Sequence, residues 1–388
     1  MEIPACVAFQ RLPLLPNKTQ TKDPKHWNSI IKHHTKLKND TGILTTYTHM
    51  ESLGICPDNS TLPLVLKACA RLNAVESGKK IHSHIQNTKL IEDVRVRTAL
   101  VDFYCKCGFF EEALHVFGEM SERDVVLWNA MISGYVGRGH HEEAIGLFMK
   151  MGRENLRPSS GTMVALLLAC GELLELRMGK EVHGYCLRNG LFEADPRVIT
   201  ALIGFYLRFD VRVSRLVFDM MDSRSIVSWN AMIRGYFDVG DCSEALKLFM
   251  QMLVDGVTFD SVTMLVAIQV CAEFGSLKLG MQIHQMAIKL EFNNDLFVAN
   301  ALLRMYSENG SLEFSRELFE SITTRDIAMW NSMISVYIGF GCYEEALSLF
   351  IRIRTECIRE DEITIAIMLS VCEQLADGLR MGKAYMPM

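Results

Sequence analysis

The tryptophans recur at one fixed interval, and this interval constrains the fold more than any other feature of the sequence. The chain has four tryptophans, each 101 residues from the next and each followed by an asparagine: Trp27, Trp128, Trp229 and Trp330. Two other residue types keep the same interval, at Cys69, Cys170, Cys271 and Cys372 and at His82, His183 and His284. Such self-similarity predicts a repeat array in which each unit packs on its neighbours.

Each 101-residue period divides into three shorter patterns. The first begins close to the tryptophan and runs for 35 residues, as in 226–260. The second also runs for 35 residues, as in 261–295, and the third for 31 residues, as in 296–326. These three lengths together account for the long interval.

Each pattern predicts two short helices. In 226–260, apolar residues spaced three and four apart place one stripe on a helical face: Trp229, Met232, Ile233 and Tyr236. Gly240 and Gly256 are expected to end the first and second helices. Helices of about 12 residues are not stable alone in water, so the pairs must bury each other's stripes. The sequence therefore predicts an all-α fold, a right-handed α-solenoid superhelix.

Composition sets the broad class of protein. The 388 residues are 49% hydrophobic and 22% charged, which is typical of a folded chain. The 12 cysteines are scattered, which favours a reducing compartment over a secreted disulfide framework. No run of about 18 apolar residues occurs, so we expect no membrane association.

Charge is unevenly distributed along the chain. The net charge of -6 argues against a broadly basic nucleic-acid surface. Residues 1–123 nevertheless hold 16 Lys and Arg against 13 Asp and Glu, whereas the rest of the chain holds 24 against 33. Nonspecific phosphate contacts are therefore expected in the N-terminal quarter.

The three patterns closely resemble pentatricopeptide repeats (PPR motifs) of the plant PLS class, which alternate P, L and S motifs. The segments that carry the resemblance are "VVLWNAMISGYVGRGHHEEAIGLFMKM", "GTMVALLLACGELLELRMGKEVHGYCLRNG" and "TALVDFYCKCGFFEEALHVFGEMSERD". A tetratricopeptide array has a similar period, but its Trp-x-x-Leu-Gly opening is missing here. The resemblance extends from residue 24 to the C-terminus and implies about ten to eleven helix-turn-helix motifs.

The resemblance also implies how the chain divides. An N-terminal segment at 1–23 precedes an array at 24–361, and 362–388 is an incomplete L motif. Complete triplets cover 24–124, 125–225 and 226–326. P motifs fall at 24–58, 125–159, 226–260 and 327–361, L motifs at 59–93, 160–195 and 261–295, and S motifs at 94–124, 196–225 and 296–326.

In this family, the resemblance implies, each repeat binds one nucleotide of single-stranded RNA through its fifth and last residues. An amide or hydroxyl at the fifth position and a carboxylate or hydroxyl at the last can address the Watson-Crick edge of an unstacked base. The uracil-type pairs are Asn28 with Asp58, Asn230 with Asp260, Asn300 with Asp326, and Asn331 with Asp361. The other pairs are Thr98 with Asp124 for guanine, Asn129 with Ser159 for cytosine, and Thr200 with Ser225 for a purine.

The L motifs carry Pro63, Val164 and Leu265 at the fifth position, and none of these side chains can read a base by hydrogen bonding. They are expected to act as spacers. The implied target is U-x-G-C-x-(A/G)-U-x-U-U.

Structural roles compete with these functional assignments. An asparagine near a helix start is often only a cap or a solvated residue, although here an aspartate follows 30 positions later in three P motifs. The tryptophans, the periodic cysteines and the periodic histidines are expected to pack in the core or at helix ends. Cys105 and Cys107 have no second cluster for zinc, so neither a metal nor another cofactor is expected.

No enzyme is expected in this chain. Zinc deaminases that act on nucleobases need a His-x-Glu with a downstream Pro-Cys-x-x-Cys. His140 and Glu142 have the first spacing, but no Cys-x-x-Cys follows them. The segment "RMGKAYMPM" at the C-terminus indicates a truncated motif. A deaminase-bearing PPR protein or other editing factors are therefore the partners expected beside RNA.

The segment 1–23 is weakly basic and suits a short transit peptide, although it is poor in Arg and Ser. The family resemblance implies an organelle, with the mitochondrion favoured and the chloroplast as the alternative.

Two classes of function remain open. The favoured one is sequence-specific binding of single-stranded organellar RNA that specifies a site for C-to-U editing, with the deaminase supplied in trans. Within RNA biology, the alternative is a stabilisation, splicing or translation factor without base chemistry. From another class, the alternative is a helical-repeat protein scaffold, and the polar residues at the reading positions favour RNA over it.

Overall fold

The computed structural model describes residues 23–86, 88–120, 123–356 and 358–384. The predicted transit segment at 1–23 lies outside this range apart from Asp23. Every regular element in the described residues is helical, which confirms the predicted all-α class. The chain forms two compact units, residues 1–191 and 192–388.

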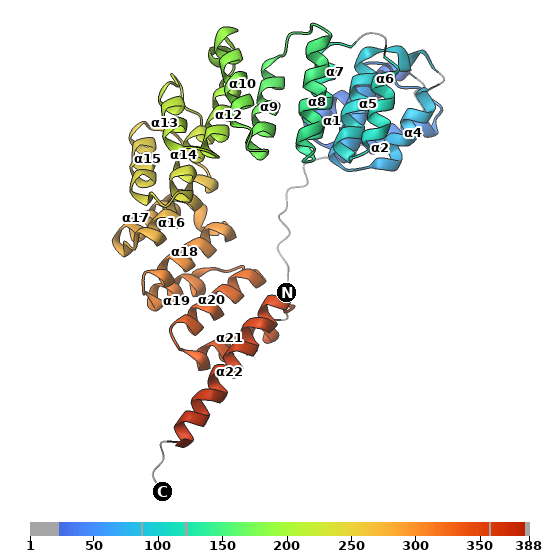
Figure 1. The fold of residues 1–388 in the computed structure, drawn as a ribbon. Coiled ribbons are helices and arrows are strands. Elements are labelled where there is room, and N and C mark those ends of the chain that lie inside the picture. Colours follow the sequence, from blue (N-terminus) through green and yellow to red (C-terminus); the bar gives the residue numbers. More distant parts are fainter. Residues whose placement is uncertain (1–22, 87, 121–122, 357, 385–388) are drawn as a thin grey trace. The chain divides into compact units, whose positions relative to one another are not determined.

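The first unit consists of consecutive helix pairs (Figure 1). The first helices of the pairs are α1 (Pro24–Lys36), α3 (Leu62–Arg71), α5 (Val94–Cys107), α7 (Val125–Gly137) and α9 (Ser160–Glu172). The second helices are α2 (Asp40–Ser52), α4 (Val75–Ile85), α6 (Phe110–Gly118), α8 (His141–Arg153) and α10 (Leu176–Arg188). A short helix, η1 (Lys89–Glu92), precedes α5, and α11 (Leu191–Ala194) precedes the second unit.

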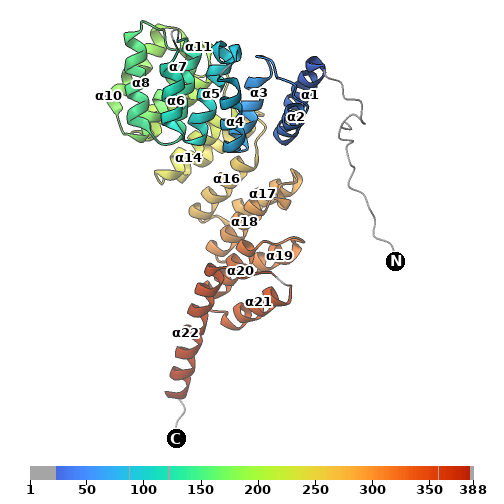
Figure 2. The ribbon, with the colours of Figure 1, turned by 90° about the vertical axis from the view of Figure 1, so that its right-hand side faces the viewer.

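The second unit repeats this arrangement (Figure 2). Its first helices are α12 (Pro196–Leu207), α14 (Ile226–Asp238), α16 (Ser261–Phe274), α18 (Leu296–Glu308) and α20 (Ile327–Gly339). Its second helices are α13 (Val211–Asp219), α15 (Cys242–Val254), α17 (Leu277–Lys289), α19 (Leu312–Ser321) and α21 (Tyr343–Thr355). The short helix η2 (Phe292–Asn294) precedes α18, and α22 (Glu362–Ala384) is a single helix at the position of the incomplete L motif.

In both units, each first helix packs on the first helix of the next pair as well as on its own second helix. The first helices therefore form one continuous layer within a unit, and the second helices cover that layer. Each unit is a stretch of α-solenoid, in agreement with the predicted fold class. None of the described helices is long and apolar enough to cross a membrane.

Glycines end the helices where the sequence predicted. Gly240 has φ +80° after α14, and Gly256 has φ +67° after α15. This left-handed backbone is accessible to glycine without the steric cost that a Cβ atom would add.

Two other glycines permit close packing between predicted L and S motifs. A Cβ atom on Gly78 of α4 would come within 2.1 Å of the Phe103 ring, and one on Gly280 of α17 within 2.3 Å of the Met305 sulfur. At these two positions, the second helix of a predicted L motif can therefore contact the next first helix this closely only because glycine has no side chain.

The tryptophans lie in the core, as predicted, and each one is at most 2% exposed. At the junction between α13 and α14, the Phe218 and Trp229 rings pack edge to face with their centroids 4.8 Å apart. The Arg224 guanidinium lies over both rings, 4.8 Å from the Phe218 centroid. Equivalent clusters occur one period away on each side, at Phe117, Arg123 and Trp128 and at Phe319, Arg325 and Trp330.

The periodic cysteines and histidines also pack as expected, with one exception. Cys69, Cys170 and Cys271 are fully buried, and His82 lies 2.8 Å from the Tyr104 hydroxyl. Cys372 on α22 is exposed, which contradicts the prediction. Cys69 and Cys271 lie on α3 and α16, which pack against the next first helices, α5 and α18, whereas no helix follows α22 in the described residues.

Replacing Trp229 by alanine should lower the free energy of unfolding by about 3 to 5 kcal/mol, because it leaves a large cavity between two repeats. Urea unfolding followed by circular dichroism measures this change. Phe297→Ala is the matched control, since Phe297 is 76% exposed and its loss should change stability by only about 0.5 kcal/mol. Equal effects of the two variants would contradict the assignment of Trp229 to the core.

Candidate nucleic-acid interface

The fifth residue of each predicted P motif lies one helical turn into a first helix, not at its cap. Asn230 lies in α14, whose N-cap is Ser225, and Asn331 lies in α20, whose N-cap is Asp326. The interpretation of these asparagines as helix caps is therefore wrong.

The last residue of most predicted motifs is itself the N-cap of the following first helix. Its side-chain oxygen accepts a hydrogen bond from a backbone N–H of that helix. Among the predicted reading residues, those that share this role are Asp124, Ser159, Ser225, Asp260 and Asp326. Asp58 and Asp361 accept from Thr61 N and Thr364 N in the same manner.

The structure brings the two reading residues of every predicted P motif into hydrogen-bond contact. The side-chain amide of the asparagine donates to the last residue of its motif in each case. The distances are 2.7 Å for Asn28 to Asp58, 2.7 Å for Asn129 to Ser159, 3.2 Å for Asn230 to Asp260 and 3.0 Å for Asn331 to Asp361.

A buried threonine, which the sequence analysis missed, completes each of these pairs. Its hydroxyl donates to the Oδ1 atom of the asparagine, at 2.7 Å for Thr263 and Asn230 and at 2.8 Å for Thr364 and Asn331. The four threonines are Thr61, Thr162, Thr263 and Thr364, each at most 1% exposed. They also stand 101 residues apart, a signal that was available in the sequence.

Within the described part of the chain, no such network joins the reading residues of the predicted S motifs. The hydroxyls of Thr98 and Thr200 donate within their own helices, to Val94 O at 2.7 Å and to Pro196 O at 3.0 Å. The partner residues Asp124 and Ser225 cap α7 and α14.

Asn300 is the asparagine among the S-motif reading residues. Its partner residue Asp326 caps α20 through Met329 N at 2.9 Å. The Oδ1 atom of Asn300 is buried and accepts no hydrogen bond within the described structure.

At the fifth position of the L motifs, Pro63, Val164 and Leu265 are half-buried. None has a polar side-chain atom that could address a base edge.

In the first unit, the reading residues Thr98, Asp124 and Asn129 border one open groove of about 660 Å³. Lys67, Arg95 and Lys106 line the same groove, together with Asp102, which lies 2.8 Å from Lys106 Nζ. Hydrogen-bonding groups and positive charge therefore face one surface, as a single-stranded nucleic acid requires. This groove lies in the N-terminal part of the chain, close to the quarter in which the charge distribution predicts nonspecific phosphate contacts.

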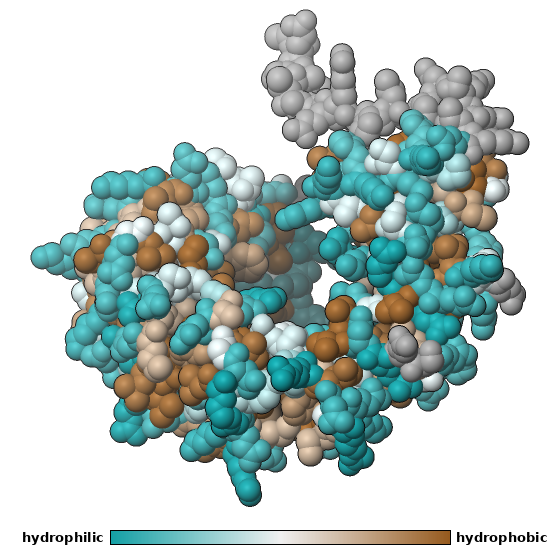
Figure 3. Space-filling model, turned by 90° about the horizontal axis from the view of Figure 1, so that it is seen from above, coloured by the Kyte–Doolittle hydropathy of each residue, from teal (hydrophilic) through white to brown (hydrophobic). Residues whose placement is uncertain are grey.

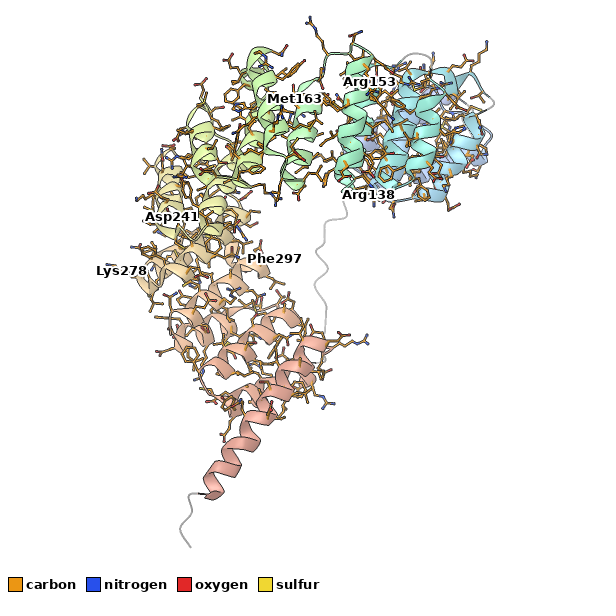
Figure 4. The ribbon with its side chains drawn as sticks, viewed as in Figure 1. Arg138, Arg153, Met163, Asp241, Lys278 and Phe297 are labelled. Carbon is orange, nitrogen blue, oxygen red and sulfur yellow. The ribbon has the colours of Figure 1, made fainter. Side chains whose placement is uncertain are left out.

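Exposed apolar side chains at the second position of several motifs form a further set that the sequence analysis missed. The members are Val126, Val227, Val262, Phe297 and Ile363, which are 52% to 76% exposed. Figure 3 shows apolar side chains dispersed among hydrophilic ones on the visible surface. In the second unit, Phe297 on α18 lies on the opposite side from Lys278 on α17 (Figure 4). The first helices therefore expose apolar side chains at the second position of these motifs, three residues before the predicted reading residue.

The carboxylates of the P motifs are held in their charged form. Partial burial alone would raise the pKa of Asp260, but hydrogen bonds from Thr263 and Asn230 outweigh it and lower that pKa below its usual value. Hydrogen bonds from Ser60 and Thr61 likewise outweigh burial and lower the pKa of Asp58. At Asp361, the hydrogen bonds from Thr364 lower the pKa.

The described residues contain no cluster of three His, Cys, Asp or Glu side chains that could hold a metal ion. His140 is the N-cap residue of α8, and its Nδ1 atom lies 3.5 Å from Glu143 Oε1 rather than near Glu142.

Sequence profiles of known families match the repeats directly. The profile described as "PPR repeat family" matches residues 123–172 and 224–273. The profile described as "PPR repeat" matches residues 96–125, 297–327 and 328–358.

Curated plant proteins are similar to most of this chain. A pentatricopeptide repeat-containing protein of Arabidopsis thaliana is 38% identical over 362 residues, which cover 91% of this chain and 55% of the relative. Two others from the same plant are 34% identical, and one is named chloroplastic and the other mitochondrial. They cover 84% and 86% of this chain and 38% and 55% of their own lengths. The chain thus spans about half the length, or less, of these relatives.

Among solved structures, the crystal structure of the pentatricopeptide repeat protein PPR10 from maize is similar, with a TM-score of 0.52 and 16% identity. The match covers 92% of this chain and 57% of that chain. It shows a common fold.

Asp260→Ala should lower the free energy of unfolding by about 1 kcal/mol at pH 7, because it removes a helix cap. The lowered pKa means that the carboxylate stabilises the fold above its unfolded-state pKa of about 3.9, and that this stabilisation is lost as pH falls through the folded-state pKa. Urea unfolding should therefore show the difference from wild type shrinking below about pH 4.

The control for this experiment is Asp238→Ala, which removes an exposed carboxylate paired with Arg234 on the surface of α14. Its effect should be small across the pH range, because exposed ion pairs contribute little. A difference between wild type and Asp260→Ala that grows on acidification would contradict the pKa assignment.

Proposed function

Because this chain belongs to the pentatricopeptide repeat family, we propose that it binds single-stranded RNA, with one nucleotide addressed by each P and S repeat. The observation that carries the proposal is the hydrogen-bonded pair of fifth and last residues, found in every P motif. A polar pair that recurs at one place in successive repeats suits a polymer with a regular spacing of bases.

The chemistry of the pair supports recognition of uracil. One N–H of the Asn230 amide bonds to Asp260, and the second can donate to a carbonyl oxygen of the base. The ionised Asp260 carboxylate retains acceptor capacity for the ring N–H of uracil. In the repeat of Asn129, Ser159 replaces the carboxylate, and a hydroxyl can donate as well as accept, which suits the ring nitrogen of cytosine.

The preferred RNA follows from the pairs in chain order. Asn28 with Asp58, Asn230 with Asp260, Asn300 with Asp326 and Asn331 with Asp361 select uracil, Thr98 with Asp124 selects guanine, Asn129 with Ser159 selects cytosine, and Thr200 with Ser225 selects a purine. The L repeats act as spacers. The target is therefore U-x-G-C-x-(A/G)-U-x-U-U.

Other groups on the same surface supply affinity without sequence preference. The exposed apolar side chains at the second position, Phe297 above all, can pack on base faces. Lys67, Arg95 and Lys106 in the groove of the first unit can neutralise phosphates.

We further propose that the bound RNA lies in an organelle and carries a cytidine that is edited to uridine, with the deaminase supplied by another protein. The alternation of P, L and S motifs supports this assignment. The names of the relatives, one chloroplastic and one mitochondrial, support an organelle, and the mitochondrion is the one we propose. Because a protein-binding groove would present varied apolar or charged residues at the fifth and last positions, the repeated Asn, Thr, Asp and Ser favour RNA over a protein partner.

Asn230→Thr should move the base preference opposite this repeat from U toward G, because Thr with Asp is the guanine-type pair. The measurement is binding to four RNAs that carry the target sequence and differ only at its seventh nucleotide. We expect the ratio of the dissociation constants for the U and G RNAs to change by about tenfold or more, since a polar pair discriminates by roughly 1 to 3 kcal/mol.

Asn294→Thr is the matched control, because Asn294 is exposed in η2 and belongs to no reading pair. It should leave the preference for U unchanged. The same preference in wild type and Asn230→Thr would overturn the assigned register.

Plants that lack this protein should retain one or a few unconverted cytidines in organellar transcripts. Sequencing of mitochondrial and chloroplast RNA from mutant and complemented plants measures this, with the complemented line as the control. Normal conversion together with altered abundance or splicing of one transcript would instead identify a factor without base chemistry. Unchanged transcripts would favour the protein scaffold.

A further inference from the structure

Each predicted P motif is followed by a threonine that contacts both reading residues of that motif. The Thr263 hydroxyl lies 2.7 Å from Asn230 Oδ1 and 2.9 Å from Asp260 Oδ1. Thr364 lies 2.8 Å from the corresponding atoms of Asn331 and Asp361. These hydroxyls are buried, so water does not compete for them.

The Thr263 hydroxyl has one proton and lies near two acceptors, Asp260 Oδ1 and Asn230 Oδ1. The other donors to these two atoms show which of them the proton satisfies. Asp260 Oδ1 already accepts from Thr263 N at 2.9 Å and from the Asn230 amide at 3.2 Å. Among the described residues, the Thr263 hydroxyl is the donor recorded for Asn230 Oδ1. The hydroxyl proton therefore satisfies the amide oxygen, and the amide nitrogen is held toward the carboxylate.

The orientation of this amide decides what the repeat offers to a base. With Oδ1 held by the threonine, the free hydrogen-bonding group of Asn230 is an N–H donor. If the amide turned over, its oxygen would face the Asp260 carboxylate, and two acceptors would meet. Without the threonine, the Asn230 amide could rotate away from this orientation and would lose only its hydrogen bond to Asp260.

The first helices that follow the S motifs have no threonine at the equivalent position. Leu127, Ser228 and Met329 stand there instead. Ser228 carries a hydroxyl, but it donates to Ser225 O, and the reading residue of that repeat is Thr200, which has no amide to hold. Asn300 is the S-motif reading residue that has a side-chain amide, and its buried Oδ1 atom has no hydrogen-bond donor among the described residues. Met329, three residues after its partner Asp326, is fully buried and stands where a threonine stands after each P motif.

We propose that Thr61, Thr162, Thr263 and Thr364 are positioning residues that lock the reading amide of each P repeat. The S repeat of Asn300 lacks this lock and therefore reads its base with less discrimination. The effect on specificity rests on the proposed RNA binding. The lock itself, the hydrogen bond from the threonine hydroxyl to the asparagine Oδ1 atom, is a property of the free protein.

The first test compares Thr263→Val, which removes the hydroxyl at constant volume, with Thr263→Ser, which keeps it. Dissociation constants are measured for RNAs that carry the target sequence with U, C, A or G at the seventh nucleotide. Thr263→Val should reduce the preference for U by about 2- to 10-fold, the effect of one net hydrogen bond, and Thr263→Ser should retain that preference. An equal loss of affinity for all four RNAs would show a packing role only and would overturn the proposal.

The second test installs the lock where it is absent. Met329→Thr should place a hydroxyl near Asn300 Oδ1 and sharpen the preference for U at the ninth nucleotide by a similar factor. Met329→Val removes the same bulk without a hydroxyl and should not sharpen it. Identical preferences in these two variants would count against the proposal.

A third measurement needs no RNA. Exchange of the Asn230 side-chain amide protons with solvent, followed by NMR of the free protein, should be about 2- to 10-fold faster in Thr263→Val than in wild type or Thr263→Ser. Unchanged exchange would overturn the lock. If wild type shows no base preference while exchange responds as expected, the lock stands and the proposed RNA recognition fails.

Discussion

The helix cap at each repeat junction is the interaction on which both packing and recognition depend. The last residue of a P motif accepts the backbone N–H groups that open the next first helix, and it also accepts the amide of the asparagine from the preceding first helix. One carboxylate or hydroxyl therefore starts a helix and orients a side chain of its neighbour. Because the cap must lie at the helix start, the reading pair is held at a constant place in every P repeat.

The core supplies the rigidity that this arrangement needs. Individual helices of 9 to 14 residues in the repeats would be marginal alone, so their stability comes from burial between neighbours. The Phe218, Arg224 and Trp229 cluster joins the end of an S motif to the following P motif, and it recurs once per period. The asparagine beside each tryptophan is therefore anchored by one of the largest buried side chains in the chain, while its own amide faces the cap.

The sequence was sufficient to predict the helical class, the burial of Trp229 and the ends of helices at Gly240, because periodicity and left-handed glycines act locally. The proximity of Asn230 to Asp260 came only through the family resemblance, since nothing local places residues 30 apart in contact. Thr263 was missed although its interval was visible, because its role depends on a contact 33 residues away in sequence. Cys372 was wrongly assigned to the core because burial depends on the next helix and not on the residue itself.

Sequence specificity is proposed to reside in P repeats that are spaced by one L and one S repeat. Selection of RNAs from a randomised pool by the wild-type protein tests this most directly. The enriched sequences should show strong pyrimidine preferences at every third nucleotide, with weaker preferences at the nucleotides opposite S repeats and none opposite L repeats. Enrichment spread evenly along the RNA, or the absence of any enriched sequence, would contradict it.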